Sequence, residues 1–324
     1  MASVPVLTAN PRFSERWRRY ARRLSVGDQV AHTTTLVCAA AIILITCVVA
    51  IELYKYSVLP RHKFGWSFLF TQIWDPVAGQ FGALPFIYGT VVTSILALLI
   101  AVPTGLGSAI FLAELAPPRI SDFLTFLVEL LAAVPSVIYG LLGVFLLLPA
   151  LGPVVKAFQH AFGSIPIFAG AFYGVSVFSA GVILSLMVVP FIVSVSREVL
   201  ISVPQEQREG ALALGASHWQ ATWDVVIPYA RKGIMGSVML ALARALGETM
   251  AVTMVIGNQP KINASLFAPG YSIAAVIANE FTEATEDLYV ESLIELGLVL
   301  FAVTFIVNGI ARILILTTQP RGAA

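Results

Sequence analysis

Two charged side chains interrupt an otherwise apolar stretch of the sequence. Arg244 and Glu248 lie in ALARALGETMAV, four residues apart, so a helix would place them on one face and within reach of each other. An arginine guanidinium donates hydrogen bonds in a planar fork that suits carboxylates and tetrahedral oxyanions. The pair is therefore interpreted either as a structural ion pair or as part of a path for an anion, in which Glu248 holds or gates Arg244.

The depth of Arg244 in its apolar segment bears on this choice. The residue follows Lys232 by 12 positions, which is about 18 Å along a helix and near the middle of a bilayer. A charged side chain there costs about 2.5–3.5 kcal/mol on insertion scales. We therefore expect Arg244 to face a protein interior or a watery path, and not lipid.

Composition places the whole chain in a membrane. Its 324 residues are 58% hydrophobic and 11% charged, with a mean hydropathy of +0.88, whereas soluble globular chains carry about 25% charged residues. Six apolar runs are long enough to cross hydrocarbon as helices. These runs cover residues 33–54, 85–113, 123–149, 172–194, 233–256 and 288–316. The predicted fold is an all-α membrane protein with six transmembrane helices, and residues 33–324 form its transmembrane domain.

The charges outside the spans predict the orientation of the chain. Residues 1–32 hold six arginines and no cleavable signal pattern, so the first apolar run is interpreted as a retained span. The aromatic spacing of this basic segment predicts a short amphipathic helix on anionic lipid, with a disordered basic tail as the alternative. The excess of Lys and Arg on this side of the spans places both termini in the cytoplasm.

The two longest connections on the other side are then outer loops. Residues 151–170 are only partly apolar and are expected to form an outer loop with an interfacial helix. Residues 257–287 form a second outer loop, and several carboxylates lie at its end. That acidic surface is either simply solvated or a docking patch for an extracytoplasmic partner.

The sequence lacks the patterns that are typical of enzymes and metal sites. Cys38 and Cys47 lie nine residues apart on one predicted helix, so they cannot bridge each other. No Gly-rich phosphate loop and no Ser/His/Asp arrangement occurs. We therefore expect no catalytic residue, no metal and no cofactor in this chain.

The longest cytoplasmic connection between spans covers about residues 205–229 and precedes the span of Arg244. Its first half, EQREGALALGA, is rich in helix-forming residues and ends at Gly215. A second short helix is predicted from Ser217 to just before Pro228. Two short helices are therefore expected to meet at a glycine on the cytoplasmic face.

This connection resembles the EAA motif of ABC-importer permeases, which reads EAA, three residues, Gly, nine residues and Ile-x-Leu-Pro. The matching positions are Glu209, Gly210, Ala211, Gly215, Val225, Ile227 and Pro228. Three of the matches are replacements: Gly for the middle Ala, Val for Ile, and Ile for Leu. The resemblance implies the type I ABC-importer (MetI-like) permease fold. It also implies that these coupling helices sit in a cleft of an ATPase subunit, where Glu209 and the following turn make the contact.

Two apolar segments indicate which group of ABC-importer permeases this chain resembles. ARALGETMAVTMVIGN and ELLAAVPSVIYGLLG resemble the PstC family, the membrane subunits of bacterial phosphate-specific ABC importers. The resemblance implies import of inorganic phosphate by alternating access across the bacterial plasma (inner) membrane. It places Arg244 and Glu248 in the substrate path. Glu129 lies in the second segment, where a structural hydrogen bond is the favoured interpretation.

The same resemblance implies a set of partners. They are a second permease subunit (PstA-like), an ATPase dimer (PstB-like) that binds ATP and Mg, and an extracytoplasmic phosphate-binding protein (PstS-like). Two rival functions are a permease for another oxyanion, such as molybdate or phosphonate, and an ion-driven secondary transporter. The first would differ in the residues of the path, and the second has no need of an ATPase docking helix. A membrane scaffold or sensor would not explain Arg244 near mid-membrane.

Overall fold

The first of two compact units is a single long helix. The computed structural model describes the backbone of residues 11–317 and the side chains of residues 28–313, and its contacts divide the chain into Met1–Lys55 and Tyr56–Ala324. Helix α1 (Pro11–Lys55) runs unbroken for 45 residues. The amphipathic helix and the first span predicted here are thus one helix, because no proline separates them. The arginine side chains before residue 28 lie outside the described side chains, so their contact with lipid stays a prediction.

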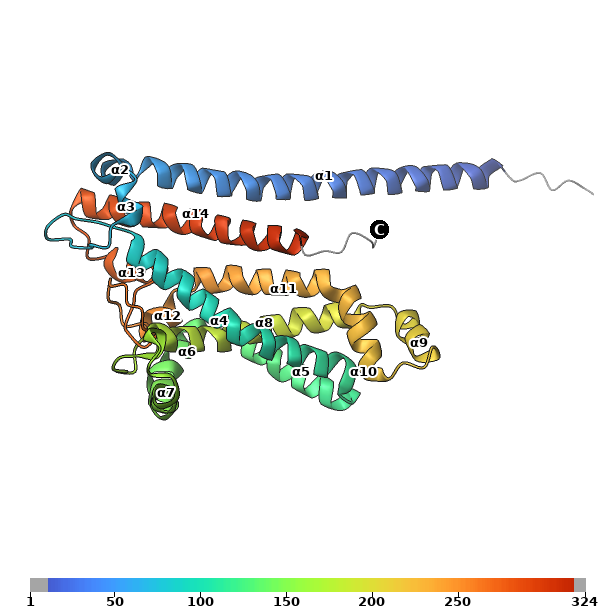
Figure 1. Cartoon of the computed structure of the whole chain (residues 1–324). Helices are drawn as coiled ribbons and strands as arrows, with labels where there is room; N and C mark the ends of the chain where they lie inside the picture. Colours follow the sequence, from blue (N-terminus) through green and yellow to red (C-terminus); the bar gives the residue numbers. More distant parts are fainter. Residues whose placement is uncertain (1–10, 318–324) are drawn as a thin grey trace, which may run out of the picture. The chain divides into compact units, whose positions relative to one another are not determined.

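The second unit is also helical, and its described residues contain no β-strand beyond the isolated bridge between Asp75 and Gln80. Figure 1 shows the arrangement of its helices. In chain order they are α2 (Val58–Phe64), α3 (Ser67–Phe70), α4 (Leu84–Ile110), η1 (Phe111–Leu115), α5 (Pro118–Ala132), α6 (Ser136–Leu142), η2 (Gly143–Leu147), α7 (Leu148–Phe162), η3 (Pro166–Phe168), α8 (Val177–Ile201), α9 (Gln205–Ala213), α10 (His218–Ala221), η4 (Thr222–Val226), α11 (Ile227–Gly247), α12 (Met250–Val255), α13 (Ile273–Glu280) and α14 (Asp287–Thr317).

Helix α8 forms the centre of this unit. It packs against α4 along most of its length and also against α5, α11 and α12. The contact with α4 is close, because a Cβ atom at Gly105 would lie only 2.9 Å from the side chain of Ile192. Small residues allow such close approach between helices in lipid. The buried face of α8 includes Ile183, Leu184 and Met187.

Among the described residues, six helices are long and apolar enough to cross a membrane, the number predicted. They are Asp28–Lys55, Leu84–Leu115, Ser136–Phe162, Val177–Ile201, His218–Gly247 and Asp287–Ile313. Four of them overlap the predicted runs over most of their length, whereas the third and the fifth differ. Each of these two differences includes a break in a helix that the prediction had treated as continuous.

The third predicted span, residues 123–149, is broken in its middle. Helix α5 ends at Ala132 and α6 begins at Ser136, because Pro135 disfavours helical backbone in the residue before it. The long apolar helix here runs from Ser136 to Phe162 and includes α7, which was expected to lie within an outer loop. Figure 1 shows α7 turned away from the direction that α4, α8 and α11 share.

The fifth predicted span, residues 233–256, is wrong at both ends. The helix continues without a break from α10 through η4 into α11, and the expected stop before Pro228 does not occur. The residues before this proline form a π-helical turn, a local widening that often occurs inside helices. At the other end α11 stops at Gly247, and a separate short helix, α12, follows.

The outer acidic loop is partly structural. The indole Nε1 of Trp74 and the hydroxyl of Tyr289 both donate to Oε2 of Glu280, at 2.9 and 2.7 Å. Oε2 of Glu291 accepts from the backbone N–H of Leu59 at 2.7 Å. These two carboxylates therefore tie the segment before α4 to α13 and α14, and they are not simply solvated.

Candidate functional site

The predicted turn at Gly215 is present, but it joins the short helix α9 to a helix that runs from His218 to Gly247 and is not short. Helix α9 ends at Ala213, and Gly215 adopts a φ of +89°, in the left-handed region that favours glycine. The next helix is started by a capping box: the Ser217 hydroxyl accepts from the Gln220 N–H at 3.3 Å, and the Gln220 side chain accepts from the Ser217 N–H at 2.8 Å. The chain thus makes a sharp, defined turn between α9 and α10.

The turn presents exposed residues. Glu209 and Gly210 are exposed on α9, and a Cβ at Gly210 or Gly215 would meet nothing within 4 Å. Leu214 lies at the tip of the turn with 91% of its surface exposed, which is unusual for a leucine. The remaining motif residues are less uniform: Pro228 is exposed, and Ala211, Val225 and Ile227 are half-buried.

An ion pair fastens α9 to the rest of the unit. Nη2 and Nε of Arg208 donate to the two carboxylate oxygens of Glu114, at 2.8 and 3.3 Å, so the pair is bidentate. The Arg208 guanidinium also donates to the carbonyls of Leu200 and Val203, at the end of α8 and just beyond it. Both charged side chains are largely buried, with 17% and 10% of their surfaces exposed. The helix that bears the motif is therefore joined directly to η1 and to α8.

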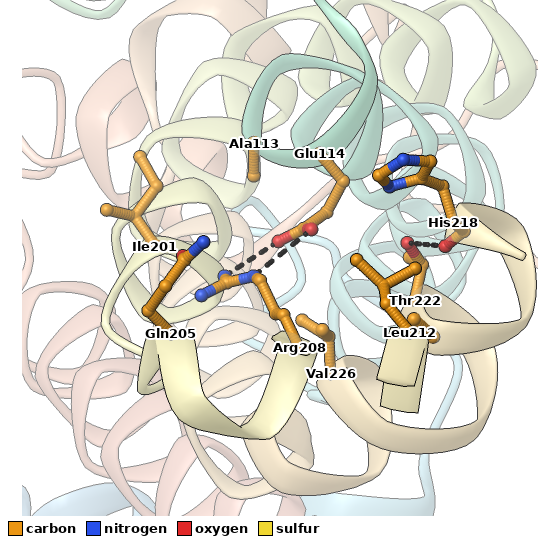
Figure 2. A pocket seen from close by; sticks show the side chains of 10 residues that line it. Ala113, Glu114, Ile201, Gln205, Arg208, Leu212, His218, Thr222 and Val226 are labelled. Atoms are coloured by element: carbon orange, nitrogen blue, oxygen red, sulfur yellow. Dashed lines mark hydrogen bonds and ion pairs between the residues drawn. The ribbon is translucent and has the colours of Figure 1, made fainter. Parts of the chain in front are cut away.

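A small hollow lies beside this ion pair. Its volume is about 370 Å³, and its lining includes Glu114, Arg208, Leu212, His218 and Thr222. Figure 2 shows Arg208 and Glu114 pointing toward each other, while the Thr222 hydroxyl donates to the carbonyl of His218. The hollow lies where α9, η1, α8 and the α10–η4 helix converge.

Arg244 lies in the last turn of α11 and stacks on an aromatic ring. Its guanidinium carbon lies 4.1 Å from the centroid of the Phe191 ring on α8, a cation–π contact. The Arg244 side chain is otherwise exposed in this chain. A charge in a membrane-spanning helix faces protein or water. The exposed side of Arg244 is therefore expected to contact another protein or a water-filled path, and not lipid.

Glu248 does not share a helix face with Arg244, and this part of the prediction was wrong. Helix α11 ends at Gly247, and Glu248 has an extended backbone (φ −71°, ψ 129°). Its Oε1 accepts from the N–H of Ala251 in the first turn of α12, at 3.4 Å. Among the described side chains, the structure contains no ion pair between Arg244 and Glu248, so the pair is not a structural salt bridge within this chain.

The helices that follow the two breaks, α6 and α12, pack against each other. Helix α6 packs on α12 so closely that a Cβ at Gly140 would lie 3.2 Å from the Cα of Ala251. The hydroxyl of Tyr139 on α6 donates to the carbonyl of Leu131 in the last turn of α5, at 2.8 Å, and so spans the first break. Non-helical backbone at membrane depth occurs where it is buried in protein or lines a cavity. Arg244 lies just before the second break, and Glu248 lies within it.

Three residues of this arrangement were not predicted from the sequence. Arg208 is not one of the motif positions, and its partner Glu114 lies 94 residues before it. Phe191 was one aromatic residue among many in an apolar span. The free-energy cost of an unpaired charge, inside the protein for Arg208 and in an apolar helix for Arg244, was the one signal that each arginine has an interaction partner.

Comparisons with known proteins identify the family of this chain. A family model described as "Binding-protein-dependent transport system inner membrane component" matches residues 101–317. The "Phosphate transport system permease protein PstC" of Mesorhizobium japonicum is 48% identical over 308 residues, 94% of each chain. The protein of the same name from Haemophilus influenzae is 42% identical over 307 residues, 93% of this chain and 97% of that one.

Solved structures of ABC transporters also match this chain. An inward-facing structure of the MetNI methionine ABC transporter aligns with a TM-score of 0.49 and 16% identity, over 74% of this chain and 98% of that chain. The assignment to a family rests on the sequence matches. The chain belongs to the binding-protein-dependent transport system inner membrane components, multi-pass membrane proteins, and within them to the PstC permease family.

Proposed function

We propose that this chain is the permease subunit of an ATP-binding-cassette importer that carries inorganic phosphate into the cytoplasm. Similarity to relatives named for phosphate transport, over 94% of the chain, supports the substrate. The guanidinium of Arg244 beside two helix breaks supports an anion path. The chain carries out no covalent step and needs no cofactor of its own, since a partner ATPase binds ATP and Mg.

The proposed partners follow from the surfaces that the chain leaves open. The exposed turn around Gly215 docks into the ATPase dimer, with Glu209 and Leu214 at the contact. A second, PstA-like permease covers the face of α11 that bears Arg244. A phosphate-binding protein delivers the anion from outside. The chain lies in the bacterial plasma membrane, and both of its termini are cytoplasmic.

The coupling between ATP hydrolysis and the path is mechanical. The ATPase moves α9 as it closes, and the Arg208–Glu114 pair passes this movement to η1 and α8. The helix from His218 to Gly247 passes it on, because its 30 residues form one rod about 45 Å long. Arg244 lies near the far end of this rod. Alternating access then follows from a tilt that moves Arg244 and the adjacent break together.

One observation carries the proposal: an unbroken helix joins the exposed coupling turn to the guanidinium of Arg244. The test is reconstitution of this chain with its second permease, ATPase and binding protein in ATP-loaded proteoliposomes. We expect uptake of radiolabelled phosphate that requires both ATP and the binding protein. Uptake of molybdate in preference to phosphate would support the rival oxyanion permease. Uptake without ATP, driven by an ion gradient, would contradict the proposed class of transporter.

A further inference from the structure

Glu129 is a carboxylate that the coupling mechanism does not use. It lies in the last turn of α5, among the exposed apolar side chains of Phe126 and Leu130, and is itself exposed in this chain. Its side chain makes no hydrogen bond or ion pair with the other residues that the structure describes. The structural hydrogen bond expected for it is thus not formed within this chain. An ionisable side chain in a membrane-embedded helix usually marks the substrate pathway.

The register between α5 and α8 places Glu129 at the depth of Arg244. Arg197 on α8 reaches the hydroxyl of Ser121 at 3.3 Å and the carboxylate of Asp122 at 3.9 Å, and the two helices run in opposite directions (Figure 1). Glu129 lies seven residues beyond Asp122. Phe191, the ring under Arg244, lies six residues before Arg197. At a rise of about 1.5 Å per residue, the distance along α5 from Asp122 to Glu129 and the distance along α8 from Arg197 to Phe191 differ by only about 1.5 Å.

A hydrogen bond near Glu129 also connects the end of α5 to the helices around Arg244. The Tyr139 hydroxyl donates to the carbonyl of Leu131, two residues after Glu129. The helix of this tyrosine, α6, packs against α12, which follows the break next to Arg244. Helical periodicity places Glu129 on α5 and Phe191 on α8 to the same side of the contact between these two helices. Glu129 and the Phe191 ring under Arg244 therefore lie at a similar level and on the same side of the contact between α5 and α8.

The chemistry of a carboxylate decides what it accepts there. Ionised glutamate has hydrogen-bond acceptors only. It repels an oxyanion that has lost all its protons, and it accepts a hydrogen bond from an oxyanion that retains an O–H group. Inorganic phosphate retains at least one proton at neutral pH, whereas sulfate retains none. We propose that Glu129 is a specificity-determining residue of the path, which admits protonated oxyanions while Arg244 binds their negative charge. This inference rests on the proposed function.

The experiment uses the complete transporter in proteoliposomes loaded with ATP and either potassium phosphate or potassium sulfate at equal ionic strength. An anion inside the vesicle reaches the inward-open path without the binding protein, so its effect reports on the permease itself. The rate of radiolabelled phosphate uptake is measured for the parent chain, for Glu129→Gln and for Glu129→Asp. The glutamine variant has nearly the same shape but adds an amide donor, and the aspartate variant keeps the carboxylate.

In the parent complex we expect luminal phosphate, and not sulfate, to slow uptake. With Glu129→Gln, sulfate should inhibit at concentrations roughly tenfold or more below those that affect the parent. Glu129→Asp should keep the discrimination, which separates the carboxylate from a role in folding. An unchanged sulfate response in the glutamine variant, or no inhibition of the parent by luminal phosphate, overturns the assignment of Glu129. Failure of the parent to import phosphate at all contradicts the proposed function instead.

Discussion

Arg208 on α9 and Glu114 in η1 form a bidentate ion pair across 94 residues of sequence, with N–O distances of 2.8 and 3.3 Å. The same guanidinium binds the carbonyls of Leu200 and Val203. The helix that carries the EAA-like motif is therefore not a loose loop on the membrane surface. It is fixed at one point to the two helices that form the centre of the unit, α4 through η1 and α8 through its last turn.

Breaking this ion pair should uncouple ATP hydrolysis from uptake. Glu114→Gln leaves the largely buried Arg208 charge without its counter-ion, and removal of one partner of a buried pair costs about 3–5 kcal/mol. We expect α9 to dock less firmly, so that the number of ATP molecules hydrolysed per phosphate imported rises several-fold. Parallel assays of ATPase rate and phosphate uptake in proteoliposomes measure this ratio.

Glu206→Gln is the matched control for the ion pair. Glu206 is an exposed carboxylate near the start of the same helix, and no hydrogen bond or ion pair joins it to the described side chains. Its loss should leave the ATP-to-phosphate ratio unchanged. Equal ratios for Glu114→Gln and Glu206→Gln would show that the ion pair does not transmit movement.

The turn at Gly215 should be intolerant of a branched side chain. Its φ of +89° lies in a region where a Cβ costs roughly 1–2 kcal/mol, although the space around it is open. We expect Gly215→Val to shift the angle between α9 and α10 and to lower uptake about tenfold, since 1.4 kcal/mol corresponds to a factor of ten. Membrane insertion, measured by immunoblot of the membrane fraction, should stay normal.

Gly210→Ala separates this backbone effect from a general sensitivity of the motif. Gly210 lies inside α9, in open space, and alanine favours a helix interior over glycine by about 0.5–1 kcal/mol. We expect full uptake with Gly210→Ala. If both glycine variants lose uptake equally, the ATPase contact itself, and not the turn, requires small residues.

Phe191 should matter through its ring. Phe191→Leu keeps the apolar volume but removes the cation–π contact with Arg244, which is worth about 0.5–2 kcal/mol depending on desolvation. We expect phosphate uptake to fall about threefold to tenfold, with little change in the ATPase rate. Phe191→Tyr retains an aromatic face and should keep most of the uptake. Equal activity of the leucine and tyrosine variants would contradict a role for the ring.

The sequence predicts those features that depend on local patterns. Run length and hydropathy are properties of one segment, so the number of long apolar helices among the described residues was predicted, although the bounds of the third and fifth were wrong. The EAA-like spacing is also local, and the turn at Gly215 occurs where that spacing places it. Pro135 is a local signal for the break in the third span, but a separate α5 was not predicted.

The features that the sequence did not predict depend on packing between distant segments. No proline follows Gly247 to mark the end of α11 in the sequence. The break depends on the packing of α12 against α6, which are distant in sequence. The assumption of one continuous helix made Arg244 and Glu248 appear as an i,i+4 pair. The partner of Arg244 is instead the Phe191 ring on a neighbouring helix, and the partner of Arg208 is Glu114. No local rule identifies such partners.

The most direct test of the account is phosphate uptake by the complete transporter that carries Arg244→Gln. This change removes the charge in the last turn of α11 but keeps hydrogen-bond donors and much of the side-chain length. Purification of the intact complex and its basal ATPase rate establish that assembly is normal. The account predicts loss of phosphate uptake, by at least tenfold if about 1.4 kcal/mol of anion binding is lost. Uptake with unchanged rate and affinity in a fully assembled complex would contradict it.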